Sequence, residues 1–202
     1  MQIARLALLG AASGVVAKLA DNSDISWASD LGTYPAIWLF TSAVIGRFSP
    51  DVIQAALRGV AFFIGLSLGY YAWSVFVLQF GIGGYLFLWG GLAVTAVPVV
   101  AAVLWWASRH RGPLAGFVMA MTAGLALSDG TVIQMWWRLL GELPGEFPLR
   151  PVQALADVVV ALVVVGIVPV HRATRGWALA LLLPAAVLAT AALNAFYGTL
   201  LR

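Results

Sequence analysis

The chain has no cysteine and few charged residues, and each shortage removes a class of function. Without cysteine there is no disulfide framework, no thiol chemistry and no cysteine metal site. Charged residues make up 9% of the 202 residues, well below the roughly 25% of typical soluble domains. The two histidines, His110 and His171, lie in short basic segments, which argues against a haem ligated inside an apolar helix.

Positive charge is present but thinly spread. The formal net charge is +3, and the arginines are scattered among short segments between apolar runs. No stretch forms a basic domain able to hold a nucleic-acid duplex. We therefore expect no nucleic-acid partner, and we expect the arginines to set orientation in a membrane instead.

Long apolar runs dominate what is present, and the mean hydropathy is +0.98. Each run is near the roughly 20 residues that a helix needs to cross a bilayer, and none alternates as a strand would. The runs are separated by turn-forming segments such as Ser49-Pro50-Asp51 and Arg111-Gly112-Pro113. This pattern predicts an all-α, polytopic transmembrane helical bundle of about seven spans, forming a single integral membrane domain over residues 1–202. The predicted spans are Ile3–Ala20, Thr33–Phe48, Ile53–Phe80, Tyr85–Ala107, Leu114–Trp137, Val152–Val170 and Trp177–Tyr197.

Charges in the connecting segments alternate between the two predicted sides of the membrane. One side carries arginines such as Arg47, Arg109 and Arg172 with one acid, Asp51, whereas the other carries most of the acids. The positive-inside rule makes the arginine-rich side cytoplasmic. An odd number of spans then predicts a cytoplasmic N-terminus, an external C-terminus and a multi-pass protein of the cytoplasmic membrane.

The fifth run is interrupted at residues 127–131 and has two interpretations. Ser128 or Asp129 can cap a new helix, with Gly130 allowing a bend, so that residues 130–141 lie in the outer interface with apolar side chains on one face. Alternatively, residues 114–137 form one continuous span that carries Asp129 below the outer surface.

Polar and aromatic residues of several predicted spans fall in the same outer layer. A carboxylate in an apolar span is costly and is read as a functional candidate. Carboxylates with tryptophan and tyrosine suit a cationic organic solute, since the rings offer a cation–π face. The predicted ligand-binding residues are Lys18, Asp21, Tyr70, Trp73, Trp89, Asp129, Asp157 and Asn194.

The same residues can also be explained by structural roles that involve no ligand. Tryptophan and tyrosine gather at membrane interfaces whatever the function. Asp129 fits a helix cap, and Asp157 fits a structural ion pair with Lys18 or Arg150. Lys18 and Asp21, spaced i and i+3, can pair across one helical turn.

Three classes of function follow from this pattern. The first is a membrane protein that binds or transports a small solute, or a coupling ion, through an outward-facing site. The second is a non-catalytic assembly, scaffold or sensor subunit. The third is an intramembrane aspartyl-type enzyme in which Asp129 and Asp157 share a proton, although the chain lacks a Gly-x-Gly-Asp element. We predict no enzyme activity, no cofactor and no metal.

Two pairs of glycines have the spacing of close helix contacts in membranes. The Gly-x-x-x-Gly pattern occurs at Gly10 with Gly14 and again at Gly65 with Gly69. Such small-residue faces suit a protein partner or a homo-oligomer as well as contacts within the chain.

Three segments carry a resemblance to a known family. The segments that carry it are Lys18-Leu19-Ala20-Asp21, Ser29–Thr33 (Ser-Asp-Leu-Gly-Thr) and Gly69-Tyr70-Tyr71. The chain resembles a family of uncharacterised small bacterial membrane proteins over most of its length. The resemblance implies that Lys18, Asp21 and Asp30 form a shared element of the first loop, and that the membrane is bacterial. It supplies no activity.

Overall fold

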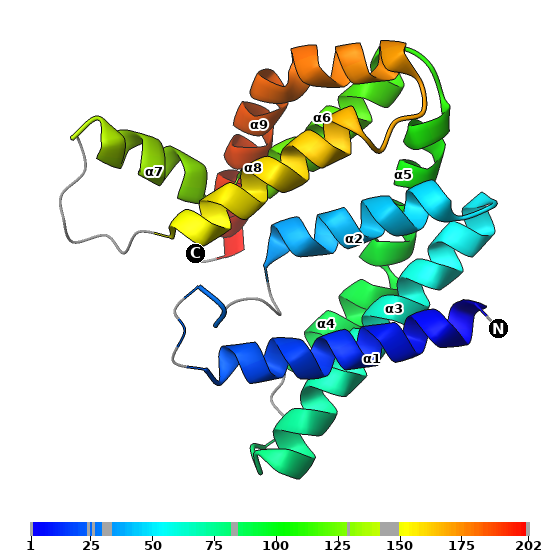
Figure 1. Ribbon diagram of the computed structural model, residues 1–202, viewed down its shortest axis with the longest axis vertical. Coiled ribbons are helices and arrows are strands. Elements are labelled where there is room, and N and C mark those ends of the chain that lie inside the picture. The colour runs from blue at the N-terminus through cyan, green and yellow to red at the C-terminus, as the bar shows by residue number, and fades with distance from the viewer. Residues whose placement is uncertain are drawn as a thin grey trace. The chain divides into compact units, whose positions relative to one another are not determined.

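A computed structural model describes residues 2–23, 25, 27–29, 34–81, 85–128, 130–141 and 150–200. Every regular element in this described part is a helix (Figure 1), which confirms the all-α prediction. The elements are α1 (Gln2–Asp21), α2 (Pro35–Phe48), α3 (Val52–Ala72) continued by the π-helix η1 (Trp73–Val77), α4 (Tyr85–Val94), α5 (Ala96–Arg109), α6 (Pro113–Ala126), α7 (Thr131–Leu139), α8 (Pro151–Gly166) and α9 (Arg172–Leu200).

Helix boundaries follow the turn residues. Asp51 caps α3, because its side chain accepts a hydrogen bond from the main-chain N–H of Gln54 at 2.7 Å. Gly112 has a φ of 113°, in the region that favours glycine, and Pro113 follows it at the first position of α6. Local sequence chemistry therefore sets where both helices begin.

Several helices suit a membrane-spanning role. Four helical stretches are long and apolar enough to cross a bilayer: α1, α3 with η1, α4 with α5, and α9 to residue 195. The bent pair α6 and α7 would make a fifth if it counts as one span. α2 has 14 residues and α8 has 16, both below the roughly 20 that a full crossing needs. These helices are compatible with a multi-pass membrane protein, while the number of seven spans and the orientation stay predictions.

The structure decides between the two interpretations of the fifth run. α6 ends at Ala126, α7 begins at Thr131, and the two helices are bent by 66°. Gly130 adopts a φ of 88° at the break. The hydroxyl of Ser128 donates back to the carbonyl of Leu125 at 2.7 Å rather than capping α7. The run is therefore a broken helix rather than one continuous span, while the place of α7 in the outer interface stays a prediction.

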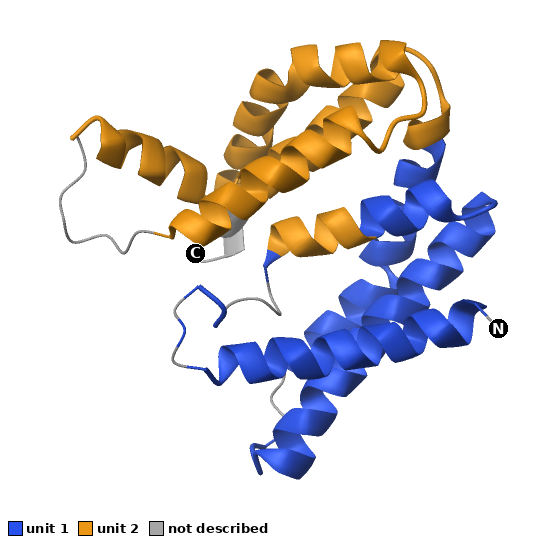
Figure 2. Ribbon diagram, in the orientation of Figure 1, with its two compact units in different colours: residues 1–34, 42–106 blue, residues 35–41, 107–202 orange. Residues whose placement is uncertain are grey.

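The chain divides into two compact units, which Figure 2 shows in different colours. Unit 1 comprises residues 1–34 and 42–106, and unit 2 comprises residues 35–41 and 107–202. α2 and α5 each contribute residues to both units. The prediction of a single membrane domain is not tested by this division and stays a prediction.

In unit 1, α1 and α3 approach so closely that their backbones touch. A Cβ added at Gly10 or Gly14 would lie 2.0 to 2.1 Å from a main-chain oxygen of α3, and one added at Gly65 or Gly69 would lie 2.1 Å from a main-chain oxygen of α1. The two Gly-x-x-x-Gly faces therefore pack against each other within the chain. A protein partner or homo-oligomer stays a prediction.

In unit 2, α6 lies at the centre and packs along α9 and α8. Its buried face consists of small residues, and a Cβ added at Gly116 or Gly124 would collide with α9. Gly116 faces Trp177 and Ala178, while Gly124 faces Ala185. Because both contacts have nearly the same offset in sequence, α6 and α9 run parallel.

α9 changes direction along its length, as Figure 1 shows. Pro184 lies inside this 29-residue helix. Proline has no main-chain N–H and its ring crowds the carbonyl four residues earlier, here that of Ala180, so it bends the helix. Pro184 therefore explains the change of direction in α9.

We predict that Gly14→Ala destabilises the protein by about 1 to 3 kcal/mol, because the new methyl group overlaps the backbone of α3. The matched control is Gly90→Ala in α4, where nothing lies within 4 Å of the added Cβ; this change should raise stability by up to ~1 kcal/mol through helix propensity. Unfolding of the purified protein in detergent micelles measures both. Equal stabilities of the two variants would contradict the close packing of α1 and α3.

Candidate functional site

A hydrogen-bonded chain in unit 1 joins three of the predicted residues. The ammonium of Lys18 donates to the hydroxyl of Tyr70 at 3.4 Å, and that hydroxyl donates to the carboxyl of Asp21. Sequence spacing predicted a direct pairing of Lys18 with Asp21 along α1. The structure places the Tyr70 hydroxyl of α3 in contact with both, so this cluster joins the two helices, and the direct pairing stays a prediction.

Aromatic rings surround the same ammonium group. Lys18 Nζ lies 4.9 Å from the ring centroid of Tyr70 and 5.4 Å from that of Phe80, within the range of a cation–π contact. Tyr71 packs edge-on against Tyr70, with ring centroids 5.2 Å apart. Two aromatic faces in this cluster thus hold the chain's own cation.

The two predicted tryptophans of unit 1 occupy different elements. Trp73 opens η1 and lines a shallow apolar hollow of about 380 Å³ together with Ala11 and Val15 of α1. Its indole Nε1 has no hydrogen-bond partner among the described residues. Trp89 lies in α4 and is half-buried.

Asp157 in α8 is completely buried, with 0% of its surface exposed. The hydroxyl of Thr131, the first residue of α7, donates to Asp157 Oδ2 at 2.5 Å. A buried carboxyl is costly unless it is hydrogen-bonded. The side chain therefore serves at least as an anchor between α8 and the start of α7, and its ion pair with Arg150 stays a prediction.

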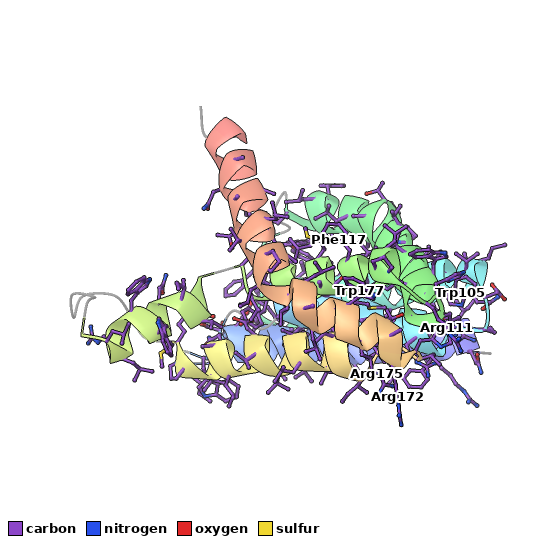
Figure 3. All side chains as sticks on the ribbon, turned by 90° about the horizontal axis from the view of Figure 1, so that it is seen from above. Trp105, Arg111, Phe117, Arg172, Arg175 and Trp177 are labelled. Carbon is purple, nitrogen blue, oxygen red and sulfur yellow. The ribbon has the colours of Figure 1, made fainter. Side chains whose placement is uncertain are left out.

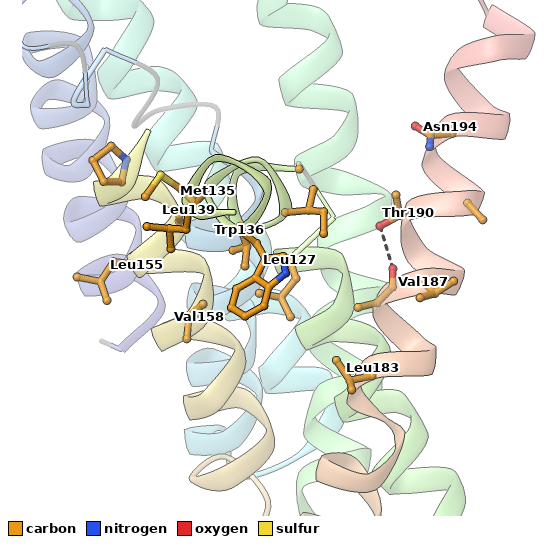
Figure 4. A pocket seen from close by; sticks show the side chains of 17 residues that line it. Leu127, Met135, Trp136, Leu139, Leu155, Val158, Leu183, Val187, Thr190 and Asn194 are labelled. Carbon is orange, nitrogen blue, oxygen red and sulfur yellow. Dashed lines mark hydrogen bonds between the residues drawn. The ribbon is translucent and has the colours of Figure 1, made fainter. Parts of the chain in front are cut away.

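An apolar groove of about 870 Å³ lies between α7, α8 and α9 (Figure 4). Met135, Trp136 and Leu139 of α7 form one wall, Leu155 and other residues of α8 form a second, and α9 contributes a third from residue 183 to residue 194. Of the described residues that line it, none carries a charge. The groove therefore suits a molecule with a largely apolar surface.

Among the described residues that line the groove, the indole of Trp136 is joined by two uncharged polar side chains, and both come from α9. Thr190 donates its hydroxyl to the carbonyl of Ala186 at 2.9 Å, drawn as a dashed line in Figure 4. Asn194, one of the predicted residues, is exposed and lies one helical turn beyond Thr190. Its amide can both donate and accept hydrogen bonds, so this end of the groove offers one uncharged polar contact.

The predicted residues thus divide among separate places. Tyr70 contacts both Lys18 and Asp21 in unit 1. Asp157 is buried beneath α7 and does not line the groove. Asn194 does line it. Asp129 lies outside the described residues, so its predicted role in an aspartyl enzyme is untested. That these residues bind a ligand stays a prediction. In the described part of the chain, no three metal-ligating side chains cluster.

Sequence reasoning missed the groove but not the helix that forms its wall. Five residues were predicted to share one face of a helix in the membrane interface: Val132, Met135, Trp136, Leu139 and Leu140. All of them except Leu140 line the groove. The sequence did not show which other helices would face this side of α7. The contribution of α9 had a weak signal in the spacing of Leu183, Val187 and Thr190, which recurs every three or four residues.

A family model described as "Family of unknown function (DUF6518)" matches residues 1–201. The chain belongs to this family. The match confirms the resemblance to a family of uncharacterised proteins and covers nearly the whole chain, while the bacterial origin stays a prediction. No curated protein and no solved structure matches the chain.

We predict that Thr131→Val loosens the attachment of α7 to α8. The valine has a similar shape but cannot donate to Asp157, which leaves a buried carboxyl oxygen without this donor at a cost of about 1 to 3 kcal/mol. Thr131→Ser keeps the hydroxyl and should retain most of the stability. Unfolding in detergent micelles compares the two, and a serine variant as unstable as the valine variant would exclude the hydrogen bond as the cause.

A double-mutant cycle tests the contact between Tyr70 and Asp21. Tyr70→Phe and Asp21→Asn should not be additive, with a coupling of about 0.5 to 3 kcal/mol in unfolding free energy. Tyr71→Phe is the matched control, because Tyr71 neighbours Tyr70 in an edge contact. Its cycle with Asp21→Asn should be additive to within ~0.5 kcal/mol. Equal couplings in both cycles would show that the Tyr70 hydroxyl is not the link.

Proposed function

We propose that this family member is a membrane protein that binds a small, largely apolar molecule in the groove between α7, α8 and α9. The observation that supports the proposal is the groove itself. Its volume of about 870 Å³ falls within the roughly 300 to 1,000 Å³ of small-molecule sites. Three helical elements form its walls, so a ligand there would contact protein on several sides.

The lining favours a neutral amphipathic ligand over the small organic cation that the sequence pattern suggested. The described lining residues offer no carboxylate, and Lys18 already lies against the rings of Tyr70 and Phe80 in unit 1. A desolvated cation in the groove would therefore lack a counter-charge among these residues. A ligand with an apolar body and one hydroxyl or amide group would match the aliphatic walls and Asn194.

Binding is a better match to the groove than passage across the membrane. Its walls come from α7, the first half of α8 and the second half of α9. In the predicted orientation these segments lie on the outer side. The ligand would therefore enter from the outer side or from the outer part of the bilayer.

The test uses three ten-carbon probes with a bromine at one end: 10-bromodecanol, 10-bromodecanoate and 10-bromodecyl-trimethylammonium. Bromine quenches tryptophan fluorescence on contact. We expect saturable quenching of Trp136, measured as the difference between the natural chain and Trp136→Phe in phosphatidylcholine nanodiscs. The alcohol should bind most tightly, because it places no charge against the apolar lining.

Ala191 and Ala192 provide matched variants, since both are exposed on α9 but only Ala191 lines the groove. Ala191→Leu should weaken binding about tenfold or more by filling the groove, and Ala192→Leu should leave it unchanged. Non-saturable quenching, or equal effects of both changes, would refute the proposed site. Tightest binding by the trimethylammonium probe would refute the proposed ligand class.

A further inference from the structure

Two turns of unit 2 are joined at the end opposite the groove: the turn between α5 and α6, and the turn between α8 and α9. The main-chain N–H of Val170 donates to the carbonyl of Ser108 at 2.8 Å. The hydroxyl of Thr174, which is fully buried, donates to the carbonyl of His110 at 2.7 Å. These bonds hold the starts of α6 and α9 next to each other.

His171 links the same two turns and fixes the position of an arginine. Its Nδ1 accepts from Nε of Arg111 at 3.2 Å, and its Nε2 lies 2.9 Å from the carbonyl of Arg109. Since Nδ1 accepts, Nε2 carries the proton and donates to that carbonyl. Arg111 is therefore held by its Nε atom, which leaves both terminal Nη groups for another acceptor.

A second arginine is held in the same manner. Nε of Arg175 donates to the carbonyl of Pro169 at 2.9 Å, which again leaves the terminal Nη groups. Arg172 lies beside it at the first position of α9, and Figure 3 shows Arg111, Arg172 and Arg175 gathered at this end of the helices. We call these three residues the arginine surface. Among the described residues of unit 2, the one acid is the fully buried Asp157, so no described carboxylate of this unit neutralises the surface.

Exposed apolar side chains begin directly next to the arginine surface. Leu114 is 64% exposed, Trp177 is 46% exposed and Phe117 is 40% exposed. A Cβ added at Gly116 would lie 2.4 Å from Cβ of Trp177, so this tryptophan lies across α6 beside Phe117. Charge and apolar area thus adjoin at the level where a lipid headgroup meets its acyl chains.

We propose that the arginine surface binds the headgroup of an anionic phospholipid, whose acyl chains lie along Leu114, Phe117 and Trp177. The terminal Nη groups of Arg111 and Arg175 form the paired donors that phosphate oxygens accept. Both side chains are already ordered by their Nε bonds, which lowers the entropy lost on binding. The adjoining apolar surface favours a lipid over a free anion. This site is separate from the groove and does not depend on the ligand proposed there.

The test measures thermal unfolding of the delipidated protein in a neutral detergent. Dioleoyl phosphatidylglycerol should raise the unfolding midpoint by about 3 to 6 °C relative to dioleoyl phosphatidylcholine, which has the same acyl chains. The double variant Arg111→Gln with Arg175→Gln should lose at least half of this difference. Arg138→Gln with Arg150→Gln removes the same charge near α7 and the start of α8, and should retain it.

Several outcomes would overturn the lipid site. One is an equal shift with phosphatidylcholine, and another is an equal loss in both double variants. An equal shift with inorganic phosphate alone would indicate a site for a soluble anion. If the double variant of Arg111 and Arg175 does not fold, the salt dependence of the phosphatidylglycerol shift in the natural chain tests the proposal. The shift must fall as salt rises to ~1 M, where screening acts over about 3 Å, and a shift that salt leaves unchanged refutes the proposal.

Discussion

The hydrogen bond from Thr131 to Asp157 is the contact on which the arrangement of unit 2 around the groove depends. α7 is short, follows a break of four residues, and would have little reason to lie against α8 without a specific attachment. In an apolar surrounding, a hydrogen bond between a hydroxyl and a carboxyl is electrostatically stronger than it is in water. The attachment lies at the first residue of α7, and the rest of that helix then presents its apolar side chains to the groove.

Unit 1 is held together by a different balance of forces. Its closest contact has almost no side chain in it, since glycines allow the backbones of α1 and α3 to touch and dispersion forces act over the whole contact. At the end of that contact, Lys18, Tyr70 and Asp21 satisfy one another. These three predicted site residues are therefore bonded within the chain, while the described lining of the groove carries no charge.

The sequence was sufficient for features that neighbouring residues determine. Continuous apolar runs predicted helices, the turn-forming segments Ser49-Pro50-Asp51 and Arg111-Gly112-Pro113 predicted breaks between them, and Gly130 indicated the bend that separates α7 from α6. It was not sufficient where the partner lies far along the chain. Tyr70 is 49 residues from Asp21, and Thr131 is 26 residues from Asp157. Neither pairing has a periodic signal, because each depends on how two helices pack. The groove was missed for the same reason, since three helical elements contribute to it.

Pro184 separates the two surfaces proposed to bind ligands. The start of α9 carries Trp177 and two residues of the arginine surface, Arg172 and Arg175, whereas the groove residues run from Leu183, next to the proline, to Asn194. Because proline omits one rung of the hydrogen-bond ladder, the carbonyl of Ala180 lacks its usual main-chain donor. A twist applied to one half is therefore poorly transmitted to the other along α9 itself. Movement at one end of unit 2 can instead reach the other through α6, because Gly116 and Gly124 place it in direct contact with both halves of α9.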